Sequence, residues 1–331
     1  MIAEIGINHN GDVDLARRLI DAAAEAGADA VKFQNYRTED FISDRNLTWS
    51  YDGPQGNVVE PQYDMFKRYE FIGDKLAAAA EHCRKRGIDF AATPTSNAGV
   101  AECVKLGAAF LKNGSDYLTC LPLIRTMART GLQTVLSTGM ADEGDIGDAV
   151  EAFRQVGGKD LVLLHCVSLY PAPPDALNLK RIPALANAFR CPVGFSDHSE
   201  GVTAAAVAVA FGAVALERHV TLDKTMPGPD HQFSADPGEL KALVQAVREA
   251  EVSLGDGAIR FGDAEKEARA QHRLSCIAAR NLPEGAVIAA TDIAFRRPGQ
   301  GLPPKFADQL VGRRTARAVP SGHVFALEDF K

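Results

Sequence analysis

The chain has 331 residues, of which 46% are hydrophobic and 24% charged, and its formal net charge at pH 7 is -7. This composition is typical of a globular chain with a sizeable core, and the negative charge argues against a nucleic-acid partner. The longest nearly apolar run, residues 202–216, is too short to span a bilayer, so we expect no membrane partner.

Chain length predicts one large domain with a small appendage, because single cores rarely grow past about 250 to 300 residues. The six cysteines are scattered without a CxxC pair, which is typical of reduced thiols in the cytosol. The N-terminal sequence MIAEIGINHNG has no charged region followed by an apolar one, so we expect no export and a cytoplasmic location.

Eight short apolar runs alternate with amphipathic, Ala-rich stretches between residue 1 and about residue 255. The runs are residues 2–6, 28–34, 88–93, 109–113, 133–137, 161–166, 192–196 and 213–217. The stretches between them have helical periodicity, and two of them close on Gly27 and Gly87 as C-caps. Continuously apolar strands separated by helices indicate a parallel sheet buried on both faces. Eight such units predict an α/β fold of the (β/α)8 TIM barrel type.

Only one connection in the predicted barrel is long, the loop of residues 35–73. Loops of this length are more often functional lids or interface elements than filler. Four of its aromatic side chains predict that it selects the substrate. These are Trp49, Tyr51, Tyr63 and Tyr69.

The C-terminal part contains an internal repeat. Residues 281–293 (NLPEGAVIAATDI) align with residues 318–330 (AVPSGHVFALEDF), and the pairs Pro283/Pro320 and Asp292/Asp329 coincide. We infer a small domain with approximate two-fold symmetry. The predicted organisation is a barrel over residues 1–261, a linker over residues 262–273 and a small domain over residues 274–331.

The active site of such a barrel lies at the C-terminal ends of its strands. His198 and His219 follow the seventh and eighth predicted strands, so they become neighbours at the rim. Two neutral imidazoles with open positions suit a divalent ion that acts as a Lewis acid. Asp197 and Glu217 are candidate partners of the imidazoles. The alternative is that both are hydrogen-bonded structural histidines, as we expect for His9 and His165.

Two lysines, Lys32 and Lys112, end apolar strands and therefore point into the barrel mouth, where an unpaired ammonium is costly. A single lysine there suits a Schiff base, whereas two predict an anion. Together with nearby hydroxyls they form a cradle for a phosphorylated carboxylate. The hydroxyls belong to Thr93, Ser115, Ser137 and Ser196. The alternative is a structural network in which the lysines pair with Glu4, Asp116 or Glu217.

Glu4 lies inside the apolar first strand, where burial raises a carboxyl pKa unless a lysine is near. Such a group suits general acid–base chemistry, although it could equally be only a salt-bridge partner of Lys32. The turn NHNGD, residues 8–12, has Asp12 as a helix cap, and a functional role for the turn stays open. In the loop of residues 223–234, Asp230 is the best candidate for a polar ligand contact.

Several motifs in fixed order resemble the sialic acid synthase family. They are EIGINHNG, VKFQ, TP, GS after Lys112, LSTGM, HC followed by YP, FSDHS, ERH, PGPD and RRPGQG. Members of that family are phosphoenolpyruvate-dependent synthases of nine-carbon keto sugars. The resemblance implies a barrel followed by a small antifreeze-like (SAF, β-clip) domain. It also implies a divalent metal of the Mn type, with Mg or Co as alternatives, and a domain-swapped homodimer in which the small domain caps the partner's site.

The same resemblance implies a role for individual residues. His198 and His219 would bind the metal, and Glu4, Lys32 and Lys112 would be catalytic. Phosphoenolpyruvate would be surrounded by Lys32, Thr93, Lys112, Ser115, Ser137, Ser168 and Ser196. The amino sugar would face Glu4, Gln34, Tyr170 and Asp230, with Arg297 reaching it from the other subunit. The acceptor would be N-acetylmannosamine or a 2,4-diacetamido-trideoxyhexose.

Some positions depart from the family pattern, notably Asn113, Asp116 and Tyr117 after Lys112, and Ser168 where relatives carry Asn. Two other functions are therefore alternatives to a phosphoenolpyruvate-dependent synthase. One is a metal-dependent aldolase or keto-acid synthase with another aldehyde acceptor. The other is a non-catalytic carbohydrate-binding protein, which predicts loss of the histidines and lysines that this chain keeps.

Overall fold

Eight parallel strands close into a barrel in the computed structural model, which describes residues 1–53 and 56–331. The order around the barrel is β1-β10-β9-β8-β7-β6-β5-β2. The strands are β1 (Ile2–Gly6), β2 (Ala30–Asn35), β5 (Asp89–Pro94), β6 (Phe110–Asn113), β7 (Gln133–Ser137), β8 (Leu161–Cys166), β9 (Val193–Ser196) and β10 (Leu216–His219). The predicted (β/α)8 fold is confirmed.

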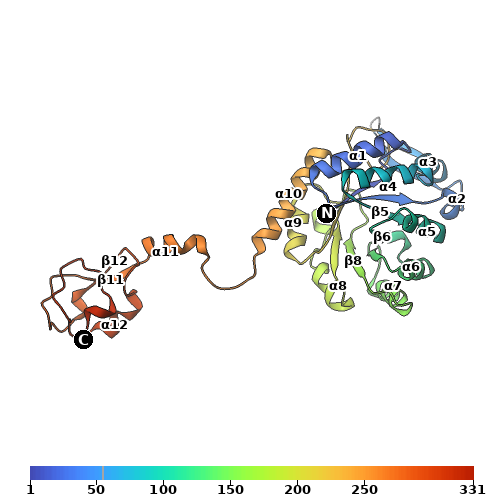
Figure 1. Ribbon diagram of the computed structural model, residues 1–331. Coiled ribbons are helices and arrows are strands. Elements are labelled where there is room, and N and C mark those ends of the chain that lie inside the picture. Colours follow the sequence, from blue (N-terminus) through green and yellow to red (C-terminus); the bar gives the residue numbers. More distant parts are fainter. Residues whose placement is uncertain (54–55) are drawn as a thin grey trace. The chain divides into compact units, whose positions relative to one another are not determined.

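Helices alternate with the strands and surround them (Figure 1). They are α1 (Val13–Ala26), α4 (Asp74–Arg86), α5 (Asn97–Lys105), α6 (Leu121–Arg129), α7 (Glu143–Gln155), α8 (Arg181–Phe189), α9 (Thr203–Ala210) and α10 (Pro237–Leu254). Gly27 and Gly87 end α1 and α4 in the left-handed conformation, as expected of C-caps. The Asp12 carboxylate accepts from the backbone N–H groups of Asp14 and Leu15, as predicted for an N-cap.

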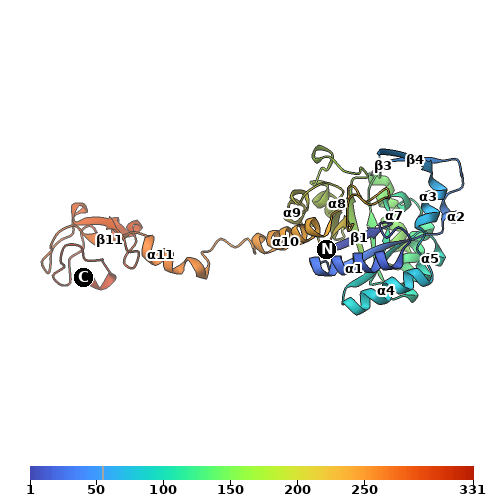
Figure 2. The same ribbon diagram turned by 90° about the horizontal axis from the view of Figure 1, so that it is seen from above.

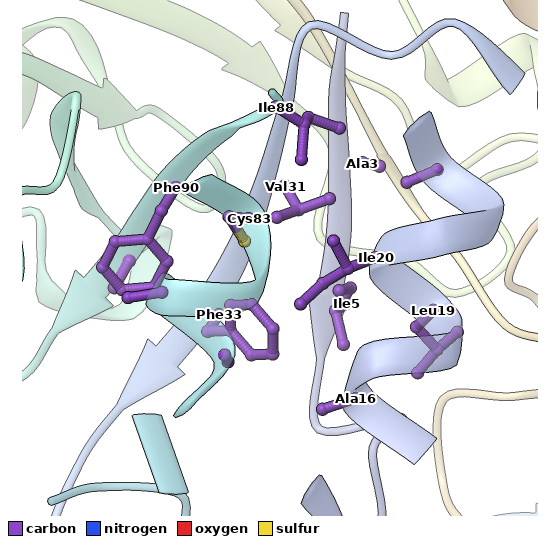
Figure 3. Packing of buried hydrophobic residues seen from close by; sticks show 14 of the residues in the cluster. Ala3, Ile5, Ala16, Leu19, Ile20, Val31, Phe33, Cys83, Ile88 and Phe90 are labelled. Carbon is purple, nitrogen blue, oxygen red and sulfur yellow. The ribbon is translucent and has the colours of Figure 1, made fainter. Parts of the chain in front are cut away.

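The core between helices and barrel is built from the apolar faces of both. Figure 3 shows Ile20 of α1 beside Ile5 of β1 and Val31 of β2, with Cys83 of α4 on the other side of Val31. All four side chains are fully buried. This packing fixes the strands, so that side chains at their C-terminal ends are held on a rigid frame.

The last predicted strand, residues 213–217, is displaced: β10 covers Leu216–His219. Gly212 adopts a φ of +89°, and hydrogen bonds with β9 begin at Val214, whose N–H donates to the Val193 carbonyl oxygen at 2.9 Å. The Ala215 carbonyl passes so close to Gly194 that a Cβ there would lie 2.4 Å from its oxygen. His219 is therefore the last residue of the strand rather than a residue beyond it.

The segment predicted as one long loop, residues 35–73, contains regular structure. It comprises α2 (Thr38–Phe41), β3 (Thr48–Gly53), β4 (Gly56–Pro61) and α3 (Gln62–Tyr69). β3 and β4 pair in antiparallel fashion, from Thr48 opposite Pro61 to Gly53 opposite Gly56. Figure 2 shows this hairpin beside α3, outside the barrel wall.

A second compact unit, Asp256–Lys331, follows the first unit, Met1–Gly255. It contains α11 (Lys266–His272), β11 (Ser275–Ala278), β12 (Ile293–Arg296) and α12 (Ala307–Leu310). The predicted linker, residues 262–273, thus includes a helix. The internal repeat is visible in the strand pairing. Ala278 pairs with Ile293, and the two residues that lie 37 positions after them, Thr315 and Phe330, also pair with each other.

The repeated aspartates have equivalent environments in this second unit. The Asp292 carboxylate binds Arg280, and the Asp329 carboxylate binds Arg317. Both carboxylates are buried and accept from the backbone N–H three residues earlier. Within residues 1–53 and 56–331, no helix has the length and apolar character needed to cross a membrane.

Candidate active site

A cavity of about 840 Å³ opens at the C-terminal ends of the barrel strands. Thirteen of the fourteen predicted site residues line it: Glu4, Lys32, Gln34, Thr93, Lys112, Ser115, Ser137, Ser168, Tyr170, Ser196, His198, His219 and Asp230. The fourteenth, Arg297, belongs to the second unit, and its contact with a sugar stays a prediction. The barrel thus gathers side chains that are up to 226 positions apart.

Four charged side chains alternate in sign at the base of the cavity. Lys32 Nζ lies 2.6 Å from Glu4 Oε2 and 3.7 Å from Glu217 Oε2. Lys112 Nζ lies 3.5 Å from Glu217 Oε1. All four side chains are at most 4% exposed. The cluster is neutral as a whole, so a bound anion would have to compete with two carboxylates for the ammonium groups.

The pKa values of the two carboxyl groups move in opposite directions. Burial raises the pKa of Glu4, and the attraction of Lys32 offsets only part of that effect. Burial also acts to raise the pKa of Glu217, but Lys112 and Lys32 together outweigh it and lower that pKa to about 2. Glu217 is thus the permanent anion of the cluster, whereas Glu4 is the carboxyl group suited to carrying a proton.

Hydroxyl groups line the cavity together with the two lysines. Thr93 Oγ1 accepts from Lys32 Nζ at 2.9 Å, and Ser196 Oγ donates to Glu217 Oε1 at 2.9 Å. Ser115 Oγ accepts from the Gly139 N–H at 3.0 Å. The buried Ser137 Oγ has no hydrogen-bond partner among the described residues. A partner-free buried hydroxyl at this place is suited to a ligand oxygen.

Gly139 shapes the same wall of the cavity. A Cβ at this position would lie 2.3 Å from Ser168 Oγ and 2.7 Å from Ser115 Oγ. Only glycine therefore lets the two hydroxyls approach the backbone after β7, and the three residues form one concave surface.

The two histidines lie side by side, with ring centroids 5.5 Å apart. His198 Nδ1 lies 2.8 Å from the Val167 carbonyl oxygen, which assigns the proton to Nδ1 and leaves Nε2 as the free lone pair. His219 Nδ1 is buried without a hydrogen-bond partner among the described residues. Burial, together with His198 and Lys32, lowers the pKa of His219 well below its ordinary value, so this imidazole is neutral.

The proton affinity of His198 differs from that of His219. Burial acts to lower the pKa of His198, but its contacts with Cys166 and Val167 outweigh burial and raise it. Asp230 Oδ2 lies 3.8 Å from His219 Nδ1. The carboxylates expected beside the histidines have other partners: Glu217 binds the lysines, and Asp197 binds Ser199 and Arg218.

Two imidazoles with free lone pairs fit a divalent ion that takes its remaining ligands from water or substrate. In the part of the chain that the structure describes, no group of three or more His, Cys, Asp or Glu side chains could hold a metal ion by itself. Aromatic rings enclose the pair: Tyr170 lies 4.1 Å from the His198 ring, and Phe233 lies 5.4 Å from the His219 ring, measured between centroids.

The outer wall of the cavity is acidic. Asp116, Glu200 and Asp230 line it, and Lys32 and Lys112 are the only Lys or Arg among the described lining residues. Burial and the charge of Glu4 raise the pKa of Asp230 to about 7. Trp49 and Tyr51 of the β3–β4 hairpin also line the cavity, whereas Tyr63 and Tyr69 are not among its described lining residues.

The alternative pairing of the lysines with Glu4 and Glu217 is confirmed: Glu4 contacts Lys32, and Glu217 contacts both lysines. One feature of the site was missed at the level of sequence, the hairpin whose strands carry Trp49 and Tyr51 to the cavity. His9 and His165 are structural, as expected: each is fully buried and stacked on a phenylalanine ring.

Comparison with known proteins matches residues 19–259 to the NeuB family and residues 275–331 to the SAF domain. The N,N'-diacetyllegionaminic acid synthase of Legionella pneumophila is 37% identical over 97% of this chain and 92% of its own length. The human N-acetylneuraminate-9-phosphate synthase is 33% identical over 95% of this chain and 88% of its own. A crystal structure of the N-acetylneuraminic acid synthetase of Leptospira borgpetersenii, in complex with citrate, has a TM-score of 0.72 and 35% identity, covering 81% of this chain and 88% of that one.

Proposed function

This chain belongs to the NeuB family of sialic acid synthases, it is an enzyme of the synthase type, and we propose that it uses phosphoenolpyruvate as donor. The proposed acceptor is an open-chain N-acetylated amino sugar, either N-acetylmannosamine or a 2,4-diacetamido-trideoxyhexose. The products are a nine-carbon keto acid and phosphate.

The observation that carries the proposal is the pair of buried ammonium groups in a cavity lined by several hydroxyls. Lys32 and Lys112 are each 3% exposed and lie on opposite sides of Glu217. Two ammonium groups with hydroxyl donors match a donor that combines a carboxylate with a phosphate. Ser137, Ser115 and Ser168 supply further hydroxyls on the wall beside Lys112. The citrate in the Leptospira relative is likewise a multiply charged carboxylate.

The acceptor is assigned to the opposite side of the cavity. Gln34, Tyr170 and Asp230 line this side near the two histidines. Their amide, hydroxyl and carboxyl groups suit the hydroxyls and the acetamido group of a sugar. In the proposed homodimer, Arg297 of one copy would contact the sugar bound to the other.

His198 and His219 would hold a divalent ion, Mn in the first instance and Mg or Co as alternatives. When bound there, the ion supplies Lewis acidity toward the aldehyde oxygen of the acceptor. The neutral state of His219 provides the lone pair that such an ion requires.

The reaction forms one C–C bond and one C–O bond to water, and it breaks the C–O bond to phosphate. C3 of the enolpyruvate attacks the aldehyde carbon, whose oxygen takes up a proton and becomes a hydroxyl. Water adds to C2 of the resulting oxocarbenium and loses a proton. Phosphate then leaves with the C2–O electron pair and takes up a proton, while the C2 hydroxyl loses its proton and becomes the keto group. Lys32 and Lys112 hold the donor throughout, and Glu4, with its raised pKa, carries the proton to or from the sugar or the water.

Phosphate release from phosphoenolpyruvate tests the proposal directly. The purified full-length chain, loaded with Mn, is assayed with N-acetylmannosamine, N-acetylmannosamine 6-phosphate and 2,4-diacetamido-trideoxyhexoses. We expect sugar-dependent release of one phosphate per keto acid formed. Absence of release with every sugar, from folded and metal-loaded protein, would favour the aldolase or the carbohydrate-binding function instead.

The variant His219→Ala tests the role of the histidine pair. We expect loss of Mn binding by calorimetry and loss of turnover, with an unchanged circular dichroism spectrum. His272→Ala, at an exposed histidine of the second unit, is the matched control and should behave as the parent. Full activity of His219→Ala would refute the metal assignment.

A further inference from the structure

We propose that the turn after β1, residues 7–11, is a clamp that holds the Asp230 loop, residues 223–234, closed over His219, and that Asn10 is its positioning residue. The assignment of Asp230 to the sugar rests on the proposed function, whereas the clamp itself does not. The turn belongs to the NHNG stretch for which the sequence left a role open.

The first arm of the clamp is Asn8, which is 1% exposed. Its amide nitrogen donates to the Val220 carbonyl at 2.9 Å and to Ser234 Oγ at 2.9 Å. Ser234 Oγ in turn donates to the backbone carbonyl of Asp230 at 2.5 Å. A continuous chain of hydrogen bonds therefore joins the turn to the backbone of the residue that faces His219.

The second arm is Asn10, which is half-buried and binds the loop through both ends of its amide. Its nitrogen donates to the Pro227 carbonyl at 3.0 Å, and its oxygen lies 3.2 Å from His231 Nε2. His231 Nδ1 lies 2.7 Å from Thr221 Oγ1. His231 is fully buried, and burial lowers its pKa to about 4, so the neutral ring donates from Nε2 to Asn10 and accepts from Thr221.

Backbone geometry shows that the turn and the loop are fitted to each other. Gly228 adopts a φ of +147°, and a Cβ there would lie 2.7 Å from His231 Cδ2 and 3.2 Å from Asn10 Oδ1. Asn10 itself has a φ of +51°, a conformation that asparagine and glycine tolerate. The close approach requires glycine on one side and a residue tolerant of the left-handed region on the other.

The clamp acts on the acceptor side of the cavity only. Asp230 lies on the clamped loop, 3.8 Å from His219 Nδ1, whereas Lys32, Thr93 and Lys112 lie on barrel strands. Releasing the loop should therefore disturb acceptor binding and leave donor binding unchanged. Weaker acceptor binding with unchanged donor binding would distinguish a positioning role of Asn10 from a general loss of folding.

The test compares Asn10→Gly with Asn178→Gly. Both asparagines are left-handed, with φ of +51° and +45°, but Asn178 is exposed and lies outside the loop and the turn. Glycine keeps the backbone and removes the side chain. In Asn10→Gly we expect amide hydrogen exchange in residues 223–234 to become about tenfold faster, since two hydrogen bonds to the loop are lost. Asn178→Gly should exchange like the parent.

Kinetics provide the second readout. In Asn10→Gly we expect the KM for the sugar to rise about tenfold while the KM for phosphoenolpyruvate stays within about twofold. Asn10→Asp keeps the oxygen that accepts from His231, so it should fall between the parent and the glycine variant in both exchange and KM.

Unchanged exchange in residues 223–234 of Asn10→Gly would overturn the clamp whatever the reaction is. Faster exchange in the loop with equal rises in both KM values would overturn the restriction to the acceptor side. Absence of turnover in the parent would refute the proposed function and leave the exchange experiment as a complete test of the clamp.

Discussion

Replacing Lys112 with methionine tests whether the buried charges depend on one another. Lys112 Nζ lies 3.5 Å from Glu217 Oε1, and both side chains are 4% exposed. Two unit charges about 4 Å apart interact by about 4 kcal/mol at an effective dielectric constant of about 20. Removing one partner of a buried pair costs about 3–5 kcal/mol. Because 1 kcal/mol shifts the Tm of a unit this size by about 2–4 °C, we expect Lys112→Met to lower Tm by about 6–20 °C.

The double variant Lys112→Met with Glu217→Gln separates pairing from burial. Glu217→Gln alone leaves two lysines facing Glu4, so we expect a comparable loss of stability. The double variant keeps the Lys32–Glu4 pair at 2.6 Å and removes both other charges, so it should be more stable than either single variant. We expect a coupling free energy of at least about 2 kcal/mol.

Urea unfolding measures all four proteins of this cycle. The only tryptophan of the chain, Trp49, lies in the barrel unit, so its fluorescence reports that unit separately from Asp256–Lys331. Circular dichroism provides the second probe for two-state behaviour. The paired cluster would be refuted if the losses of unfolding free energy in the two single variants sum to the loss in the double variant within about 0.5 kcal/mol. Turnover should be lost in all three variants, since each disturbs the proposed donor site.

Three further predictions concern other parts of the chain. Gly139→Ala should raise the KM for phosphoenolpyruvate, because the new methyl group displaces Ser115 and Ser168; an unchanged KM would contradict this wall. The acidic outer wall should favour an uncharged sugar, so kcat/KM for N-acetylmannosamine should exceed that for its 6-phosphate, and the reverse order would contradict the argument. Burial acts to raise the pKa of Asp329, but a backbone N–H and Arg317 outweigh it and lower that pKa. Its stabilising effect is therefore full above about pH 4 and lost as pH falls through the folded pKa. Calorimetry should show that Asp329→Asn lowers the stability of the second unit at pH 7 and lowers it less at pH 3. An equal loss of stability at both pH values would contradict this pH dependence.

The positions of the strands could be predicted because each is a short apolar run between turn residues. Seven of the eight predicted runs overlap their strands closely, and β1, β7 and β8 coincide with them at both ends. The eighth predicted run, residues 213–217, overlaps β10 only at Leu216 and Glu217. Its earlier residues also bond to β9, since the Val214 N–H donates to the Val193 carbonyl and the Ala215 carbonyl accepts from the Phe195 N–H.

The β3–β4 hairpin could not be predicted from the sequence. Its position depends on contacts with α3, the helix that follows it, as much as on local pattern. Tyr51 donates to Glu60 at 2.8 Å, and Arg68 of α3 binds the same carboxylate with two hydrogen bonds of 2.7 Å. The Tyr51 ring also packs against the apolar cluster that contains Met65. Sequence indicates aromatic residues in a long connection, but not which of them the folded chain anchors.

The three consecutive residues Glu217, Arg218 and His219 of β10 contact different parts of the site. Side chains alternate across a strand, so the first and third share the inner face of the barrel and the second lies on the outer face. Glu217 accordingly contacts both lysines, and His219 lies two residues further along the same face, at the cavity and beside His198. Arg218 binds Asp197 at 3.1 Å and the Gly201 carbonyl at 2.7 Å.

This alternation explains why charged residues follow an apolar run in the sequence. The outward arginine satisfies the carbonyl groups of the loop after β9, and so fixes the segment that begins with His198. The inward carboxylate holds the two lysines at the proposed donor side, while the inward imidazole faces the proposed acceptor side. Since the three side chains are fixed by one strand, a change in its register would move the lysine partners, the histidine pair and the β9 loop together. The apolar run before them contributes α9, whose buried face packs into the core through Ala204, Ala205, Ala208 and Val209.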